Sequence, residues 1–313
     1  MQKELYPCKI DQSMQPAMVY RPDSKERRPL AVCLHTWSYD CTANCSDYLQ
    51  LAQKYGWNMI FPDFRGPNWT PPACGSDAVV SDLEDAVRYM KETSLVDAKR
   101  VYLIGGSGGG HCSLLMAGRR PDLWAGVSSW CPISDVAQWH RECKGNGKND
   151  KYSQDIEKAC GGVPDESPDA MREARLRSPL TWLPNAENVT LDIGTGIHDG
   201  HGPFSVPVSQ AIRAYNILAH PEDRISEEDM RTIVQDETIP EHLRFQGEDP
   251  AYGAHTVLLR CQSNHVRLTL FEGAHTILPA TGFHWLARQC QGQEPDWSIV
   301  KPQEDVTATE LSR

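Results

Sequence analysis

The chain has 313 residues and a formal net charge of −11 at pH 7. This length fits one large α/β domain, and the negative charge argues against nucleic acid or an anionic membrane surface as a partner. No apolar stretch approaches the roughly 18 residues needed to span a bilayer, and residues 1–6 lack the apolar segment of a signal peptide. We therefore expect a soluble protein, cytoplasmic unless a signal was removed, in which case periplasmic or secreted.

The chain contains eleven cysteines, an odd number, and their spacing matches no zinc pattern well. Cys33, Cys112 and Cys131 lie in apolar patterns, where a free thiol behaves as a small hydrophobic residue. Cys143 and Cys160 flank a polar loop, and an oxidising compartment would allow them to form a disulfide. Cysteine usage thus leaves the compartment open, and we expect no metal and no cofactor.

The first third of the chain alternates predicted strands and helices. In chain order, the pattern predicts a hairpin of residues 4–10 and 17–21, a strand at 30–34, a helix at 43–55, a strand at 58–61 and a helix at 77–93. The segment 30–34 is an unbroken apolar run, which is typical of a strand buried on both faces. Such alternation indicates a mostly parallel sheet with helices on both faces.

An apolar run from Val101 then leads into Gly-Gly-Ser-Gly-Gly-Gly at 105–110 and a helix-forming segment from His111. Strand, sharp turn and helix are the context of the nucleophile elbow G-x-S-x-G, with Ser107 at its tip. Two alternatives compete, a phosphate-binding loop and an ordinary tight turn. A phosphate-binding loop is disfavoured because no Lys-Ser/Thr follows the glycines.

The rest of the chain interrupts this alternation twice. The pattern predicts a strand at 124–130, a cap insertion at 132–188, a strand at 189–193, a helix at 207–218, a second insertion at 219–256, a strand at 266–271 and a helix at 276–290. We expect a single domain over residues 1–313. The predicted class is α/β. The nucleophile elbow indicates, within this class, the α/β-hydrolase fold, which has a mostly parallel central sheet with helices on both faces and here carries cap insertions.

A serine nucleophile needs a base and an acid, and this fold supplies them in the order Ser, Asp or Glu, His. Asp199 follows the strand at 189–193 and His275 follows the last strand. Both therefore join Ser107 at the carboxyl edge of the sheet, where active sites of such sheets lie. Asp135 is a rival acid, because its loop also follows a strand. Asp192 lies within a strand and is expected to be structural.

Other residues receive supporting roles. The backbone N–H groups of Gly108 and Trp37 are the expected donors to the oxyanion. Thr36 stands where lipases and esterases carry Gly, which leaves the conformation of this loop open. His198 and His201 flank Asp199 and are expected to shape the site, since a serine mechanism needs no metal. The candidate substrate contacts are Arg65, His111 and Trp139.

Several motifs together resemble the catalytic domain of the prolyl oligopeptidase-like branch of α/β-hydrolases. They are Arg21-Pro22, Pro62-Asp-Phe-Arg-Gly66, the elbow, Arg177-Ser-Pro179, the Asp199 loop and Gly273-Ala-His275. The resemblance implies the triad Ser107, Asp199 and His275. The chain differs from the large oligopeptidases by lacking a propeller-sized N-terminal region and by the long 219–256 insertion. The His35-Thr36-Trp37 loop resembles stand-alone bacterial acetyl and pectin methyl esterases.

Three functional hypotheses follow. The first is a serine carboxylic ester hydrolase, a carbohydrate esterase that removes acetyl or methyl groups from a plant-type polysaccharide or oligosaccharide. Tryptophans near strand ends would stack on sugar rings there, namely Trp37, Trp69, Trp130, Trp139 and Trp182. The alternative is a prolyl oligopeptidase-like serine peptidase or acylaminoacyl hydrolase. The third is a non-catalytic binding module. The sequence indicates a small-molecule or oligosaccharide ester as partner and leaves the oligomeric state unknown.

Overall fold

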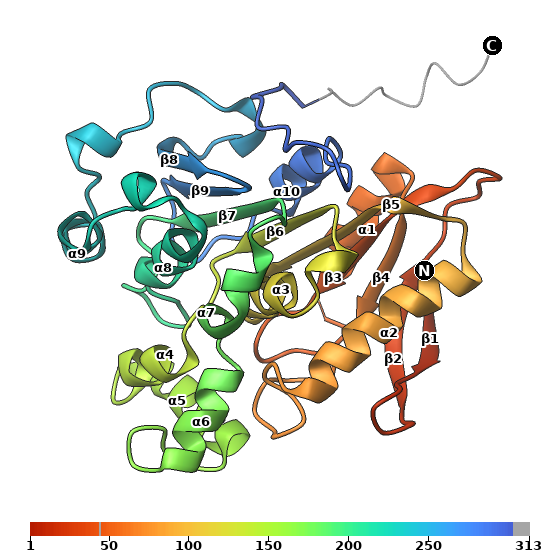
Figure 1. Cartoon of the computed structure of the whole chain (residues 1–313), viewed down its shortest axis with the longest axis horizontal. Coiled ribbons are helices and arrows are strands. Elements are labelled where there is room, and N and C mark those ends of the chain that lie inside the picture. Colours follow the sequence, from red (N-terminus) through yellow and green to blue (C-terminus); the bar gives the residue numbers. More distant parts are fainter. Residues whose placement is uncertain (44, 303–313) are drawn as a thin grey trace.

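The computed structural model describes residues 1–43 and 45–302, in which a nine-stranded sheet is flanked by helices (Figure 1). The strand order is β1-β2-β4-β3-β5-β6-β7-β9-β8. The strands are β1 (Gln2–Pro7), β2 (Met14–Tyr20), β3 (Arg28–Leu34), β4 (Asn58–Pro62), β5 (Val96–Gly106), β6 (Gly126–Trp130), β7 (Leu191–Gly196), β8 (Val257–Ser263) and β9 (Val266–Phe271). The six central strands run parallel, namely β4, β3, β5, β6, β7 and β9, whereas β1 and β2 at one side and β8 at the other pair antiparallel. The sheet is mostly parallel, as predicted.

Helices cover both faces of the sheet. They are α1 (Cys45–Tyr55), α2 (Asp77–Thr93), α3 (Gly108–Arg119), α4 (Val136–Cys143), α5 (Asp150–Cys160), α6 (Pro168–Leu176), α7 (Pro179–Trp182), α8 (Val208–Leu218), α9 (Glu227–Asp236) and α10 (Pro279–Leu286). Apolar residues of α2, α3 and α8 belong to the core on one face, and those of α1 and α10 to the core on the other. The sheet is therefore buried from both sides.

The central strands serve both cores because side chains alternate between the faces of a strand. On β3, Leu30, Val32 and Leu34 join the core under α2 and α3, whereas Ala31 and Cys33 join the core under α1 and α10. This is why the sequence of β3 is an unbroken apolar run rather than an alternating one.

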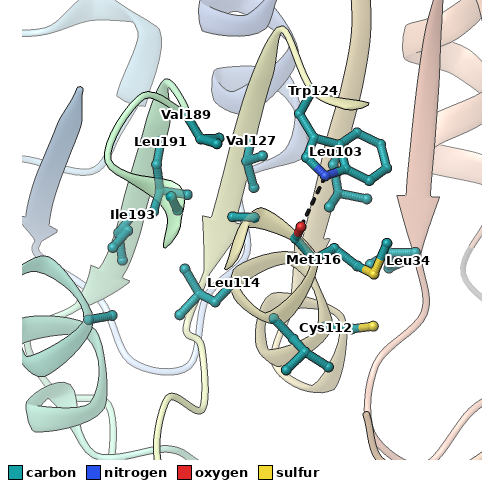
Figure 2. Close-up of a cluster of buried hydrophobic side chains, with 14 of the residues drawn as sticks. Leu34, Leu103, Cys112, Leu114, Met116, Trp124, Val127, Val189, Leu191 and Ile193 are labelled. Carbon is teal, nitrogen blue, oxygen red and sulfur yellow. Dashed lines mark hydrogen bonds between the residues drawn. The ribbon is translucent and has the colours of Figure 1, made fainter. Parts of the chain in front are cut away.

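Figure 2 shows the larger core between α3 and the central strands. Leu103 and Val127 project from neighbouring parallel strands toward Leu114 on α3. The indole N–H of Trp124 donates to the carbonyl of Met116 at 3.3 Å, so the segment entering β6 is tied to the helix that follows the nucleophile elbow. This packing holds α3 against one face of the sheet.

A third apolar cluster lies mostly in the segment predicted as a cap, residues 132–188, which contains α4 to α7, and it also includes Trp37, Cys74 and Val206. In Figure 1, α4, α5 and α6 gather in one group beside the sheet. Trp139 of α4 and Tyr152 of α5 stack with ring centroids 4.9 Å apart, and Trp139 also packs edge-on against Trp37 at 4.8 Å. The cap thereby rests on the loop that follows β3.

Several elements differ from their predicted positions. No strand was predicted for β8, whose half-buried residues directly follow a polar segment. The last helix is shorter than predicted, because Pro279 begins α10 and the helix ends at Leu286. Predictions that extend to residue 44 or to residues 303–313, including the domain bounds, lie partly outside the described residues.

All eleven cysteines are free thiols, so Cys143 and Cys160 are not bridged here. Both side chains pack in the apolar cluster of the cap, where burial raises the pKa of each thiol. Among the described residues, no helix has the length and apolar character required to cross a membrane.

Candidate active site

Ser107 lies at the tip of a sharp turn between β5 and α3, with φ 56° and ψ −119°. A positive φ is strained for a residue with a side chain, and such strain persists only where the surroundings impose it. Here the Ser107 N–H donates to the carbonyl of Trp130 at 2.8 Å. The hydroxyl does not cap α3, and the residue lines a cavity that it shares with His275.

The glycines of the elbow are required by close packing. A β-carbon at Gly105 would lie 2.5 Å from the carbonyl oxygen of Gly109, so the end of β5 and the first turn of α3 touch backbone to backbone. A β-carbon at Gly108 would lie 2.5 Å from the backbone nitrogen of Trp37. The elbow therefore packs directly on the loop after β3.

Asp199 and His275 meet at the same edge, after β7 and β9. The Nδ1 atom of His275 lies 2.9 Å from both carboxylate oxygens of Asp199. The carboxylate also accepts bonds from the Thr195 hydroxyl at 3.0 Å and the Val206 N–H at 2.9 Å. Asp199 is buried, so these donors fix its orientation. Because Nδ1 faces Asp199, Nε2 of His275 is the nitrogen left for the nucleophile.

The surroundings of His275 alter its protonation. Burial disfavours the charged ring, but the neighbouring Cys131 and Asp199 outweigh this effect and raise the pKa of His275 well above its usual value. Burial also raises the pKa of the Cys131 thiol, which is therefore uncharged near neutral pH. We accordingly attribute the raised pKa of His275 to the Asp199 carboxylate.

Two backbone N–H groups lie where an oxyanion hole is expected. Gly108 is the first residue of α3, where an N–H has no acceptor within the helix. Trp37 packs against it, and its carbonyl is held by the N–H of Asn68 at 2.9 Å. Trp37 and Ser107 line the same cavity. The arrangement is compatible with the predicted oxyanion roles of Gly108 and Trp37.

The cavity beside Ser107 is small, about 170 Å³. Aromatic side chains from three segments form much of its wall: Tyr39 after β3, Tyr152 on α5 and Phe204 in the Asp199 loop. Sequence reasoning missed all three residues. Phe204 follows Asp199 closely in the chain, which was a usable signal, whereas nothing near Tyr152 connects α5 with Ser107.

None of the three predicted substrate contacts lines the cavity beside Ser107. Arg65 forms ion pairs with Asp11 at 2.6 Å and Asp82 at 2.7 Å, which raise the pKa of its guanidinium against the opposing effect of burial. It is a structural ion-pair residue outside the cavity. His111 is fully buried, its Nε2 lies 2.7 Å from the Arg177 carbonyl, and burial lowers its pKa to about 4.

The third predicted contact, Trp139, is buried beneath the cavity wall, where it packs between Trp37 and Tyr152. Burial also removes three of the five tryptophans that were predicted to stack on sugar rings. Trp37, Trp130 and Trp139 are core residues, and only Trp69 and Trp182 are partly exposed. Lys151 covers the ring of Trp69 and Arg119 that of Trp182.

The remaining acids and histidines have structural partners. Asp135 caps α4 by accepting the N–H of Gln138 at 2.9 Å, so it is not the triad acid. Asp192 pairs with Arg267 on β9 at 2.7 Å, as expected of a structural residue. His198 lies between Glu237 and Glu272, whose hydrogen bonds raise its pKa, and it joins the second insertion to the triad loops.

Comparison with known proteins agrees with this geometry. Residues 72–224, just under half of the chain, match the model of the prolyl oligopeptidase family. The matched segment contains the elbow and Asp199 and ends before His275. No curated protein matches the chain.

Solved structures share the fold at low sequence identity. The acylaminoacyl peptidase of Pyrococcus horikoshii is similar with a TM-score of 0.64 and 15% identity, over 95% of this chain and 43% of that one. A puromycin-hydrolysing peptidase of Mycobacterium tuberculosis gives 0.57 and 16%, over 91% and 38%. The chain thus spans less than half the length of these proteins. The predicted α/β-hydrolase fold is confirmed.

Proposed function

We propose that this protein is a serine hydrolase that cleaves amide or ester bonds through an acyl-enzyme. The observation that carries the proposal is the meeting of three loops: Ser107 at a strained elbow shares a cavity with His275, whose Nδ1 lies 2.9 Å from Asp199. Ser107 is the nucleophile, His275 the base and Asp199 the acid that orients the base.

The proposed reaction has the following steps. Nε2 of His275 takes the proton of the Ser107 hydroxyl as its oxygen attacks the substrate carbonyl. The N–H groups of Gly108 and Trp37 hold the developing oxyanion. Nε2 then gives the proton to the leaving amine or alcohol. Water attacks the acyl-enzyme, with His275 again as the base, and releases the acid and free Ser107.

For the substrate, we propose an acylated peptide or amino acid in first place. The match to the prolyl oligopeptidase family and the shared fold of acylaminoacyl peptidases support this assignment. The cavity beside Ser107 is small, and the described residues that line it include aromatic and hydroxyl side chains but no carboxylate to pair with a free amine. Such a cavity suits a neutral acyl group better than a charged N-terminus.

The same cavity keeps ester hydrolysis as a second candidate, because a small acetyl group would also fit it. The carbohydrate esterase hypothesis rests on the sequence, and the burial of Trp37, Trp130 and Trp139 weakens it. A panel of N-acetylated and free aminoacyl anilides, p-nitrophenyl acetate, and acetylated or methyl-esterified polysaccharides separates these possibilities. Preference for N-acetylated anilides supports the first assignment, and release of acetate or methanol from a polysaccharide supports the esterase.

Replacing the nucleophile tests the proposal as a whole. Ser107→Ala is expected to lower kcat by roughly 10⁶-fold, the size of the loss seen when a triad serine is removed. The variant should also lose labelling by a fluorophosphonate probe, while circular dichroism stays unchanged. Turnover by the Ala variant, or absence of labelling in the unmodified protein, would refute the proposal and favour a non-catalytic binding module.

A further inference from the structure

One thiol lies against the triad without a role in the mechanism above. Cys131 directly follows β6 and has φ 46°. Its N–H donates to the Gly194 carbonyl on β7 at 2.8 Å, and its Sγ lies 3.3 Å from the carbonyl oxygen of Thr276. These contacts hold the buried side chain between β7 and the loop that carries His275.

The thiol completes a set of three different metal ligands. Among the described residues, Cys131 Sγ, a carboxylate oxygen of Asp199 and a ring nitrogen of His275 all lie within 4.8 Å of one another. Thiolate, carboxylate and imidazole are the protein ligands of Zn²⁺. Tetrahedral zinc with ordinary bond lengths places such atoms about 3.3–3.6 Å apart, so small movements bring them to bonding distance.

We propose that Cys131, Asp199 and His275 form a binding site for a thiophilic divalent cation, Zn²⁺ or Cd²⁺, and that the bound ion switches the triad off. The binding site stands on the geometry alone, whereas the inhibition rests on the proposed hydrolase function. The three side chains leave one position of a tetrahedral ion for water.

Metal binding would inhibit the triad because it changes the protonation of Cys131 and His275. Metal binding releases the thiol proton of Cys131 to solvent, since the thiolate is the ligand. The neutral ring of His275 binds the ion through Nδ1, and the proton that Nδ1 carried moves to Nε2. A protonated Nε2 no longer accepts the proton of Ser107. Asp199 changes from a hydrogen-bond acceptor to a ligand.

A second cluster provides a matched control. Asp40, Cys41 and Asp63 also lie within 4.8 Å of one another by their ligand atoms, but this cluster has no imidazole and no triad residue. Cys41, like Cys131, is a buried thiol. Cys41→Ser therefore tests whether a metal effect comes merely from a buried thiol beside carboxylates.

The experiment titrates Zn²⁺ and Cd²⁺ into protein treated with EDTA. Hydrolysis is followed with the best substrate of the panel, and the ultraviolet absorption of the cadmium–thiolate bond is followed separately. Both ions are expected to inhibit the unmodified protein and Cys41→Ser equally, and EDTA should reverse the effect. Cys131→Ala should need at least about tenfold more metal for the same fractional inhibition, since even outer-shell changes cost 10–100-fold in metal affinity.

The absorption keeps the test independent of turnover. It should develop in the unmodified protein and be lost in Cys131→Ala, or in Cys131→Ser, which preserves side-chain size if the Ala variant misfolds. Equal inhibition with and without Cys131, or no difference in absorption, would overturn the proposed site. Hydrolysis without any metal response would reject only this site, and metal binding without hydrolysis would reject only the proposed function.

Discussion

In the proposed mechanism, the contact between Asp199 and His275 sets the pH range in which the triad works. His275 must be neutral to accept a proton, and its pKa is raised, so activity should fall as the pH drops through that pKa. We expect the acidic limb of kcat/KM to have its midpoint above about 6.5, the ordinary pKa of histidine. A pH–rate profile measures this midpoint, and a midpoint at or below that value would contradict the assignment.

Removing the Asp199 charge should move the acidic limb of the pH–rate profile to lower pH. Asp199→Asn is expected to shift the midpoint to lower pH and to reduce kcat by roughly 10⁴-fold at the plateau, because the ring loses its orienting acid. Asp135→Asn is the matched control, since Asn also caps a helix and Asp135 caps α4. If the Asp135 variant lost activity and the Asp199 variant did not, the acid would have been chosen wrongly.

The sequence predicted that three loops meet at one edge of the sheet, and it missed the contacts that depend on tertiary packing. Ser107, Asp199 and His275 follow three strands whose carboxyl ends share an edge, and spacing alone reveals that. The ion pair of Arg65 with Asp11 and the hydrogen bond of His111 to Arg177 were not predicted, because these partners are distant in the chain. Nothing near Cys131 in the sequence indicates its contact with the triad.

At the scale of elements, the two triad loops depend on close contact between β7 and the segment after β9. Gly196 ends β7, and a β-carbon there would collide with the carbonyl oxygens of Gly273 and Ala274. Gly196→Ala should therefore push the His275 loop away from Asp199. We expect a large loss of kcat and a destabilisation of at least about 1–3 kcal/mol, the usual cost of overpacking.

Gly202 offers the control, because it lies in the loop after Asp199 and a β-carbon there meets nothing within 4 Å. Gly202→Ala should change neither kcat nor the melting temperature appreciably. Steady-state kinetics and thermal unfolding of the two variants measure the difference. Equal behaviour of the two would show that the β7–β9 approach does not position the triad.

The elements themselves were predictable where their patterns were unambiguous. The apolar run of β3, the helical spacing of α2 and the elbow each determine one local structure. Strand β8 was missed because an edge strand needs only a partly buried face, and its pattern merges with the polar segment before it. The end of α10 depends on packing, since Trp285 stacks on Trp297 beyond the helix.

For the whole molecule, the buried charged pair on β7 and β9 should contribute more to folding than an ion pair on the surface. Asp192 on β7 and Arg267 on β9 are both buried, with 2.7 Å between Oδ1 and Nε. The guanidinium also lies over the ring of Trp297, 5.0 Å from its centroid. The pair thus joins the strands that precede Asp199 and His275 to the segment after α10.

Removing one partner leaves the other charge buried without compensation. Asp192→Ala should lower the free energy of unfolding by about 3–5 kcal/mol, measured by urea denaturation. Asp165→Ala breaks an exposed pair with Arg141 and should leave the urea midpoint nearly unchanged, because solvent screens such pairs. Replacing both charges, as Asp192→Leu with Arg267→Met, should recover much of the loss. A single Asp192 variant as stable as the unmodified protein would show that Arg267 finds solvent or another partner, and the strands carrying the triad would then be held by apolar packing alone.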